Sequence, residues 1–347
     1  MRSSKLMWYA MMITVFSVTC FAAGNKPNYR LLKTHKLGGG DGKTEYWDYI
    51  TLDESTRRLF LSHGTEVKVV EADTGKVVGN IDGLNRAHGV ALVKELGRGF
   101  ISNGGANEVV IFDINTLQVL GHVATGGNPD CIIYDPASRR IFTMNGNSKD
   151  ASAIDPAKGT VVGTVAMGGR PEYAVADGKG AIFDNIEDTG EVAKLDSRTL
   201  SVQARWPAAP AANITAIAMD TKHRRLFLGG RNKVLAIMDA DNGKMIQTFP
   251  IGDGVDATIY DAKTGLVFSS MRDGTLYIFH EDTPNKFSLV QTVKTEYGAR
   301  NMALDPKTHQ LYLDTADFGP APAPTMQQPH PQPTPVPGTF RLLVYGP

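Results

Sequence analysis

The sequence predicts an all-β fold, a seven-bladed β-propeller of four-stranded antiparallel blades. One pattern recurs seven times at a spacing of 40 to 44 residues: an apolar stretch, a turn, and a second apolar stretch that ends in a small or polar residue. Val, Ile, Phe and Tyr alternate with a period of two, and no amphipathic helix exceeds a turn or two. A period in the forties with about four short strands per unit is typical of a propeller.

Residues 1–23 have the features of an export signal peptide. Arg2 and Lys5 supply a positive start, Leu6 to Phe21 is apolar, and a small-residue exit follows at Cys20-Phe21-Ala22. The apolar run is short for a membrane span, so an uncleaved anchor is the weaker alternative. We therefore expect a periplasmic or extracellular protein with no transmembrane segment after signal cleavage.

Cleavage of this segment leaves 34 basic against 36 acidic residues, so the mature chain is near neutral. The basic footprint of a nucleic-acid binder is absent, and nucleic acid is not an expected partner. Residues 28–347 are long enough to bury a large core, and we expect them to form one monomeric propeller domain.

The third and fourth strands of each blade are expected on either side of a short turn. In the first blade these are Glu66–Val70 and Lys76–Ile81, and Asp73-Thr74-Gly75 between them supplies turn chemistry. The next four pairs are Val109–Asp113 with Val119–Val123, Ala153–Asp155 with Thr160–Val165, Val192–Asp196 with Ser201–Trp206, and Val234–Asp239 with Met245–Phe249. In the sixth blade, Leu276–Phe279 and Leu289–Val293 are expected to flank a longer acidic turn over residues 280–284.

The two ends of the chain are expected to share the seventh blade. Asn301–Leu304, Gln310–Leu313 and Phe340–Tyr345 supply three strands, and the fourth is missing at the C-terminus. Tyr29–Leu37 is an unassigned strand near the other end. Pairing the two ends would cover a sheet edge that otherwise promotes aggregation, and it favours seven blades over six or eight.

The chain resembles the exported YVTN-repeat (YncE-like) propeller family. The matching residues are strand ends such as Phe142-Thr143-Met144-Asn145 and Phe100-Ile101-Ser102-Asn103, and the turns Gly126-Gly127-Asn128-Pro129 and Gly168-Gly169-Arg170-Pro171. The resemblance covers roughly residues 28–345 and implies the fold and export. It implies no single activity, because the family includes binding proteins, surface proteins and relatives of lactonases and dehydrogenase subunits.

A ligand site is expected at the mouth of the central channel, where two sets of positions converge. The positions at which the first strands begin are Asp48, His88, Asp130, Glu172, Thr215, Asp256 and Arg300. The positions at which the second strands end include His63, Asn103, Asn145 and Asn185, and nearby loops add Arg86, Arg170, Arg231, Arg272 and Asp317. The carboxylates predict an acidic mouth, unless they only accept backbone hydrogen bonds and the Asn side chains only cap turns.

Two classes of function fit these residues. The first is a non-enzymatic binding protein that takes a ligand or a protein partner at the channel mouth. The second is a metal-assisted lactonase or hydrolase, in which Asp48, Asp130, Glu172 and Asp256 hold a divalent ion and His88 or Glu172 is the general base. Oxygen ligands suit Ca²⁺ or Mg²⁺ better than zinc, so we assign no cofactor and leave open one of these divalent cations. Recognised haem, zinc and phosphate-loop motifs are absent, which favours the binding protein.

The segment Pro320 to Gly338 contains eight prolines in nineteen residues. It is inserted between the second and third strands of the last blade, so it is expected on the same face as the channel mouth. Such a composition favours extended polyproline geometry or disorder. A solvated insertion is the simplest interpretation, and a flap over the channel or a docking segment are the alternatives.

Overall fold

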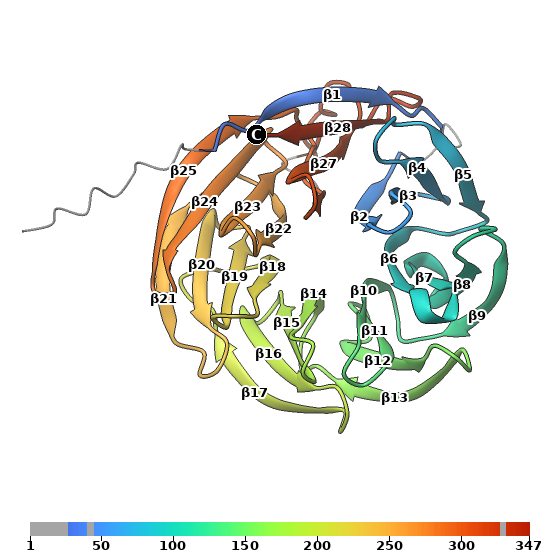
Figure 1. Ribbon diagram of the computed structural model, residues 1–347, viewed down its shortest axis with the longest axis horizontal. Helices are drawn as coiled ribbons and strands as arrows, with labels where there is room; N and C mark the ends of the chain where they lie inside the picture. Colours follow the sequence, from blue (N-terminus) through green and yellow to red (C-terminus); the bar gives the residue numbers. More distant parts are fainter. Residues whose placement is uncertain (1–26, 40–44, 327–330) are drawn as a thin grey trace, which may run out of the picture.

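The computed structural model describes residues 27–39, 45–326 and 331–347, and within them 28 strands form seven four-stranded antiparallel sheets arranged as a ring (Figure 1). The predicted seven-bladed propeller is confirmed. The expected signal peptide, residues 1–23, lies outside the described residues. In the described part of the chain, no helix is long and apolar enough to cross a membrane.

The first six blades each consist of four consecutive strands, the innermost first. The first three blades are β2 (Trp47–Asp53), β3 (Arg58–His63), β4 (Glu66–Glu71) and β5 (Val77–Asp82); β6 (Ala87–Val93), β7 (Arg98–Asn103), β8 (Glu108–Asp113) and β9 (Val119–Ala124); and β10 (Pro129–Asp135), β11 (Arg140–Asn145), β12 (Asp150–Asp155) and β13 (Thr160–Ala166). Two single-turn 3-10 helices, η1 (Lys94–Leu96) and η2 (Gly104–Ala106), flank β7.

The next three blades continue the same order around the ring. They are β14 (Pro171–Ala176), β15 (Ala181–Ile186), β16 (Glu191–Asp196) and β17 (Ser201–Pro207); β18 (Ile214–Asp220), β19 (Arg225–Gly230), β20 (Val234–Asp239) and β21 (Met245–Pro250); and β22 (Val255–Asp261), β23 (Leu266–Met271), β24 (Thr275–Thr283) and β25 (Lys286–Lys294). The sixth blade differs from its prediction, because the acidic residues expected in a long turn continue β24 and leave only Pro284 and Asn285 between the strands.

The seventh blade joins both ends of the chain. Its strands are β26 (Met302–Asp305), β27 (Gln310–Thr315), β28 (Arg341–Gly346) and β1 (Arg30–Lys36), in the spatial order β1-β28-β27-β26. Figure 1 shows β1 lying outside β28, which confirms the predicted closure. Tyr29 anchors this strand: its ring packs against Phe268, and its hydroxyl donates a 2.9 Å hydrogen bond to the carbonyl of His309.

The core lies between neighbouring blades. One aromatic side chain occupies the same position in each second strand and is fully buried: Phe60, Phe100, Phe142, Phe183, Phe227, Phe268 and Tyr312. These rings and the aliphatic side chains of the adjacent strands form the hydrophobic clusters that join each blade to the next. Burying apolar area contributes about 25 cal/mol per Å², so this repeated layer is the main source of stability for the ring.

Candidate functional site

Irregularities in the first strands place side chains at one end of the central channel. The register between first and second strands shifts between Trp47 and Ile50, and the equivalent shift recurs in each of the first six blades. The residues within these shifts include Asp48, His88, Asp130, Glu172, Thr215 and Asp256. Because a bulge redirects a side chain out of the regular alternation, the repeat places one polar or charged group per blade at this end.

The channel mouth contains a cavity of about 220 Å³. Its lining residues are Tyr46, Asp48, Tyr49, Arg86, Asp130, Arg170, Glu172, Thr215, Arg231, Asp256, Arg272 and Arg300. The structure therefore brings together the four predicted carboxylates and Arg300, from five different blades. In the following paragraphs we call this space the channel cavity.

His88 lies beside the channel cavity and connects two of its carboxylates. Its Nδ1 atom is 2.7 Å from Oδ2 of Asp48 and 3.3 Å from Oδ1 of Asp130, and the hydroxyl of Tyr46 donates to the same oxygen of Asp48 at 2.6 Å. Burial opposes ionisation of His88, but Asp130 and Asp48 raise its pKa above the ordinary value. Burial also acts against the charged form of Asp48, yet the hydrogen bond and charge of His88 lower the pKa of Asp48 overall. Both shifts favour the imidazolium–carboxylate form of this pair.

Close packing fixes the ring of His88. A side chain at Gly104 would place its Cβ 2.6 Å from Nε2 of His88, so only glycine fits there. Within the described residues, Nε2 is buried and has no hydrogen-bond partner.

Asp256 and Glu172 are surrounded by arginines. Asp256 forms ion pairs with Arg300 and, at 3.3 Å, with Arg231. Arg170 lies 3.4 Å from Oε2 of Glu172. This contact is close enough for an ion pair but is not aligned for a hydrogen bond, and Oε2 is buried without a hydrogen-bond partner in the described residues.

Burial and neighbouring acids change the protonation of two carboxyl groups. Burial, followed by Asp130 and Glu187, raises the pKa of Glu172 to about 9. Burial, opposed by His88 and reinforced by Asp48 and Asp256, raises the pKa of Asp130 to about 6. Glu172 is therefore a neutral carboxylic acid at neutral pH, and it can donate a hydrogen bond.

The lining of the channel cavity is not predominantly acidic, unlike the predicted mouth. Five guanidinium groups line the channel cavity, those of Arg86, Arg170, Arg231, Arg272 and Arg300. They face four carboxyl groups, of which Glu172 is protonated at neutral pH, so the cationic groups are in excess. The prediction of an acidic mouth counted the first-strand carboxylates and gave the loop arginines no weight, although they were visible in the sequence.

The predicted residues at the ends of the second strands do not line the channel cavity. His63 contacts Glu45 at 2.7 Å, Asn103 donates to Glu108 at 2.9 Å, and Asn145 donates to Asp150 and to Ser152. The two asparagines contact residues five to seven positions away, whereas Glu45 is 18 positions from His63, and all of these contacts stabilise loops and turns.

Asn185 is displaced from its expected place. The equivalent strand end in its blade is Ile186, which pairs with Pro171 as Asn145 pairs with Pro129. Both polar atoms of the Asn185 side chain are buried without hydrogen-bond partners among the described residues. The sequence pattern expects a polar residue at the end of the second strand. Because β15 has polar residues before its end, the prediction took Asn185 as the strand end, one position too early.

The predicted metal ligands separate in the structure. Asp48 and Asp130, together with His88, each offer one atom to a group in which all three atoms lie within 4.8 Å of one another. Glu172 and Asp256 are not part of this group. The contacts of His88 are hydrogen-bond distances, and the surrounding arginines disfavour a divalent cation, so the donor set fits Ca²⁺ or Mg²⁺ poorly.

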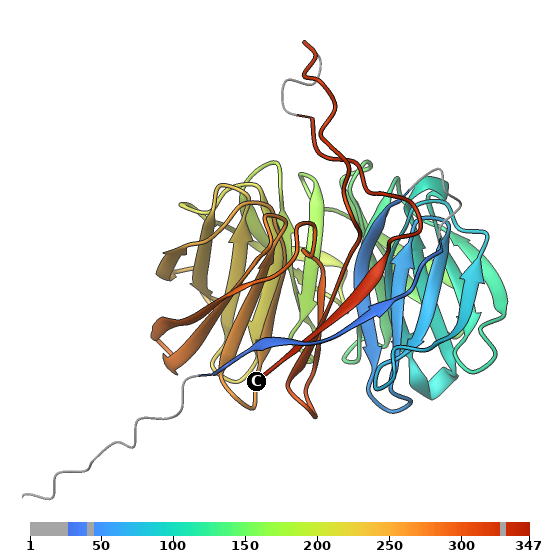
Figure 2. The same ribbon diagram turned by 90° about the horizontal axis from the view of Figure 1, so that it is seen from above.

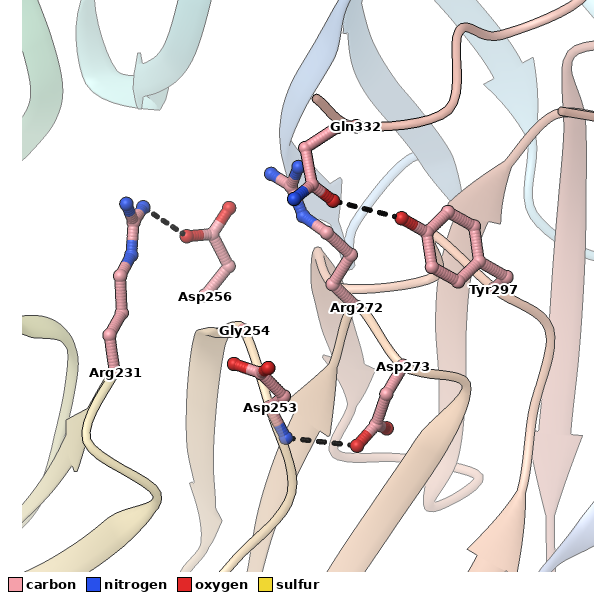
Figure 3. A pocket seen from close by; sticks show the side chains of 8 residues that line it. All are labelled: Arg231, Asp253, Gly254, Asp256, Arg272, Asp273, Tyr297 and Gln332. Atoms are coloured by element: carbon pink, nitrogen blue, oxygen red, sulfur yellow. Dashed lines mark hydrogen bonds and ion pairs between the residues drawn. The ribbon is translucent and has the colours of Figure 1, made fainter. Parts of the chain in front are cut away.

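A second cavity of about 330 Å³ adjoins the mouth, and we call it the rim pocket (Figure 3). Arg231, Asp256 and Arg272 line both cavities. Gln332, from the proline-rich segment, forms part of the rim-pocket wall, where its Oε1 accepts a 3.1 Å hydrogen bond from the hydroxyl of Tyr297. The proline-rich segment is therefore located at the channel-mouth face.

Comparisons with known proteins identify the fold and nothing more specific. No protein-family model matches the chain, and no curated protein matches it. Among solved structures, a hydrazine synthase chain of Kuenenia stuttgartiensis is 16% identical with a TM-score of 0.70, covering 79% of this chain and 93% of its own. A chain of the mitotic checkpoint complex is 13% identical with a TM-score of 0.72, covering 99% of both chains.

Proposed function

We propose that this protein is a non-enzymatic, exported binding propeller of the YVTN-repeat type that holds a small polar ligand in the channel cavity. The main support is the arrangement of the bulged first strands, which direct charged side chains from several blades into one cavity of about 220 Å³. Drug-sized ligands occupy pockets of about 300–1,000 Å³, so the ligand is small or enters only in part.

A protein partner at the same face is the second form of this proposal. One propeller of similar fold belongs to a crystal structure of the mitotic checkpoint complex. In the present chain, the proline-rich segment beside the rim pocket could contribute to such an interface, since it adds exposed surface next to the mouth.

The charges at the mouth argue against the hydrolase alternative. Glu172 is protonated at neutral pH and so cannot be the general base there, although it could donate a proton. His88 is held by two carboxylates, which favour its protonated form. Asp48, His88 and Asp130 remain the donor set that favours a metal-dependent activity. Turnover of lactones or esters that disappears with a chelator would establish the hydrolase instead.

The binding proposal can be tested by thermal shift and titration calorimetry. The processed protein is screened against sugars, lactones, small acids, peptides and divalent ions, each with and without chelator. We expect at least one small ligand to raise Tm, and Asp256→Asn to weaken its binding because Arg231 and Arg300 lose their shared partner. Lys158→Gln, at an exposed turn, is the matched control. The proposal fails if no ligand binds, or if both variants bind like the wild type.

Export is tested separately. We expect the protein recovered from the periplasm or medium to begin near residue 24, as measured by intact mass. Full-length mass in the cytoplasmic fraction would contradict export without affecting the proposal for the channel cavity.

A further inference from the structure

Arg272 is an uncompensated cation at the junction of the two cavities. Its guanidinium has no ion pair and no hydrogen bond with any residue in the described ranges, whereas Arg170 contacts Glu187, and Arg231 and Arg300 both contact Asp256. Burial, followed by the charge of Arg300, lowers the pKa of Arg272. Since arginine stays protonated in proteins, this crowding of like charges is a cost that a bound anion would remove.

The position of Arg272 makes this charge accessible to a ligand. Arg272 lines the channel cavity and the rim pocket, as Arg231 does. Figure 3 shows Arg231 and Arg272 on either side of Asp256, with a dashed line joining Asp256 to Arg231 and none joining it to Arg272. Asp256 already contacts Arg231 and Arg300, and its charge favours the protonated form of Arg272 without an ion pair between the two.

Glu172 supplies an independent observation from the other side of the channel cavity. It is only 8% exposed, it lines the cavity, and its Oε2 atom has no hydrogen-bond partner among the described residues. The groups that face it are Asp130, Glu187, Asp256 and Arg170, and burial among these acids favours its neutral form. A neutral carboxyl group presents an O–H donor, which complements an oxyanion.

We propose that the ligand of the channel cavity carries a small oxyanion, a carboxylate or a phosphate, bound by Arg272 and Arg231 with Glu172 as a further hydrogen-bond donor. This inference rests on the proposed ligand-binding function of the mouth and specifies its ligand class. A guanidinium matches carboxylate and phosphate oxygens in a planar, two-point arrangement, which is why arginine is suited to both. The remainder of the ligand extends into the rim pocket, beside Tyr297 and Gln332. Because Asp253 and Asp273 also line that pocket, this part of the ligand carries no negative charge.

The size of the two cavities limits the ligand. The channel cavity of about 220 Å³ holds roughly seven waters at about 30 Å³ each, so it accepts one compact anionic group. The adjoining rim pocket of about 330 Å³ accommodates a second group of similar size. A small organic acid or a phosphorylated small molecule fits this space, and a polymer does not.

The test is titration calorimetry at pH 7 with inorganic phosphate, inorganic sulfate, acetate and succinate, which separates the phosphate from the carboxylate source. We expect at least one of these anions to bind, and Arg272→Gln to weaken it at least tenfold. Arg272→Lys keeps the charge but loses the planar fork, and we expect an intermediate loss. Lys158→Gln removes one exposed charge elsewhere and is expected to leave affinity unchanged.

Glu172 is tested by two substitutions. Glu172→Gln keeps a donor and is expected to bind the anion within about threefold of wild type. Glu172→Ala removes the donor and is expected to weaken binding more than Glu172→Gln does. Equal affinity for both variants would overturn the role of Glu172.

The outcomes separate this inference from the proposed function. Because Arg272 has no partner in the free protein, we expect Arg272→Gln to melt no lower than wild type, so a folding defect does not confuse the result. If none of the four anions binds, or if Arg272→Gln binds them like wild type, the oxyanion inference is wrong. If a neutral or cationic ligand then binds and Asp256→Asn weakens it, the proposed function stands without this inference.

Discussion

Arg57 and Asp305 form an ion pair of 2.7 Å between Nη1 and Oδ2, although 248 positions separate them in the sequence. Arg57 lies in the first blade and the fully buried Asp305 ends β26 of the last blade. The same guanidinium also contacts the exposed carboxylate of Asp73 at 2.7 Å. This arginine therefore connects the two blades that meet where the ring closes.

We expect Arg57→Gln to lower the free energy of unfolding by about 1–3 kcal/mol, because it leaves a buried carboxylate short of one partner. Asp305 retains hydrogen bonds from Lys307 and Thr308, so the loss should not exceed this range. The measurement is urea unfolding followed by tryptophan fluorescence. Asp73→Asn removes only the exposed contact and should change stability by less than about 1 kcal/mol. Equal losses for both variants would contradict the importance of the buried pair.

Closure of the seventh blade gives a second prediction, at Tyr29. This side chain is 3% exposed and packs in the core cluster that includes Phe268. We expect Tyr29→Ala to cost about 3–5 kcal/mol, as for other large-to-small changes of aromatic core residues. Leu31→Ala, at an exposed position in β1, which begins directly after Tyr29, is the control and should cost little. If chemical denaturation gives similar midpoints for both, the N-terminal strand does not hold the ring closed.

The repeat explains why the fold could be predicted in detail. The aromatic residue of the second strand, for example Phe60 or Phe142, recurs at a fixed place because each blade must bury one ring against its neighbour. The unpaired strand Tyr29–Leu37 had one possible place, beside the incomplete last blade. The prediction of strand ends from regular alternation was wrong where polar residues lie inside strands, as at Asn185 and at the acidic end of β24.

The candidate site was predictable in position but not in charge. Radial symmetry brings Asp130 and Glu172 to the same channel, whatever their neighbours are. Whether Arg272 or Arg170 projects into that channel depends on loop conformation, which carries no periodic signal. Protonation of Glu172 depends in turn on burial and on three nearby acids, so it requires the three-dimensional arrangement.

Asp314 provides a prediction about pH. It is fully buried, neither carboxyl oxygen has a hydrogen-bond partner in the described residues, and burial raises its pKa well above the ordinary value. The native state therefore keeps a proton that the unfolded chain releases above its ordinary pKa of 3.8. Since the native state binds more protons, this group lowers stability as pH rises from about 4 to 8.

We expect Asp314→Asn to remove this contribution. Asparagine has nearly the same shape and no titration, so the stability of the variant relative to wild type should be greater at pH 8 than at pH 4. The comparison between the two pH values cancels any constant packing effect of the substitution. The measurement is guanidinium unfolding of both proteins at both pH values. If the difference in unfolding free energy between variant and wild type does not change with pH, Asp314 ionises in the native state.

The proline-rich segment provides the last prediction, which separates its base, packed on the blades, from the residues beyond it. Figure 2 shows the described parts of the segment, residues 320–326 and 331–338, rising away from the ring. Gly319 donates to the carbonyl of Thr334 at 2.9 Å, and Val336 donates to that of Asp317 at 2.7 Å. Phe318 packs against Trp47 and Tyr297 with ring centroids 5.9 and 4.8 Å away, so the part that contacts the blades is the base.

We therefore expect replacement of residues 320–333 by a short Gly-Ser linker to change the unfolding free energy by less than about 1 kcal/mol, since long surface insertions affect stability weakly. Phe318→Ala should cost more, because it removes the aromatic contact at the base.

Binding at the mouth distinguishes two roles of the segment. If it is only a solvated insertion, its replacement leaves ligand affinity unchanged, whereas if it forms a wall of the rim pocket, its replacement weakens binding. Because Gln332 lines that pocket and accepts a hydrogen bond from Tyr297, we expect the shortened chain to fold normally and to bind its ligand more weakly. Unchanged affinity in calorimetry would show that ligands are held by the channel cavity alone.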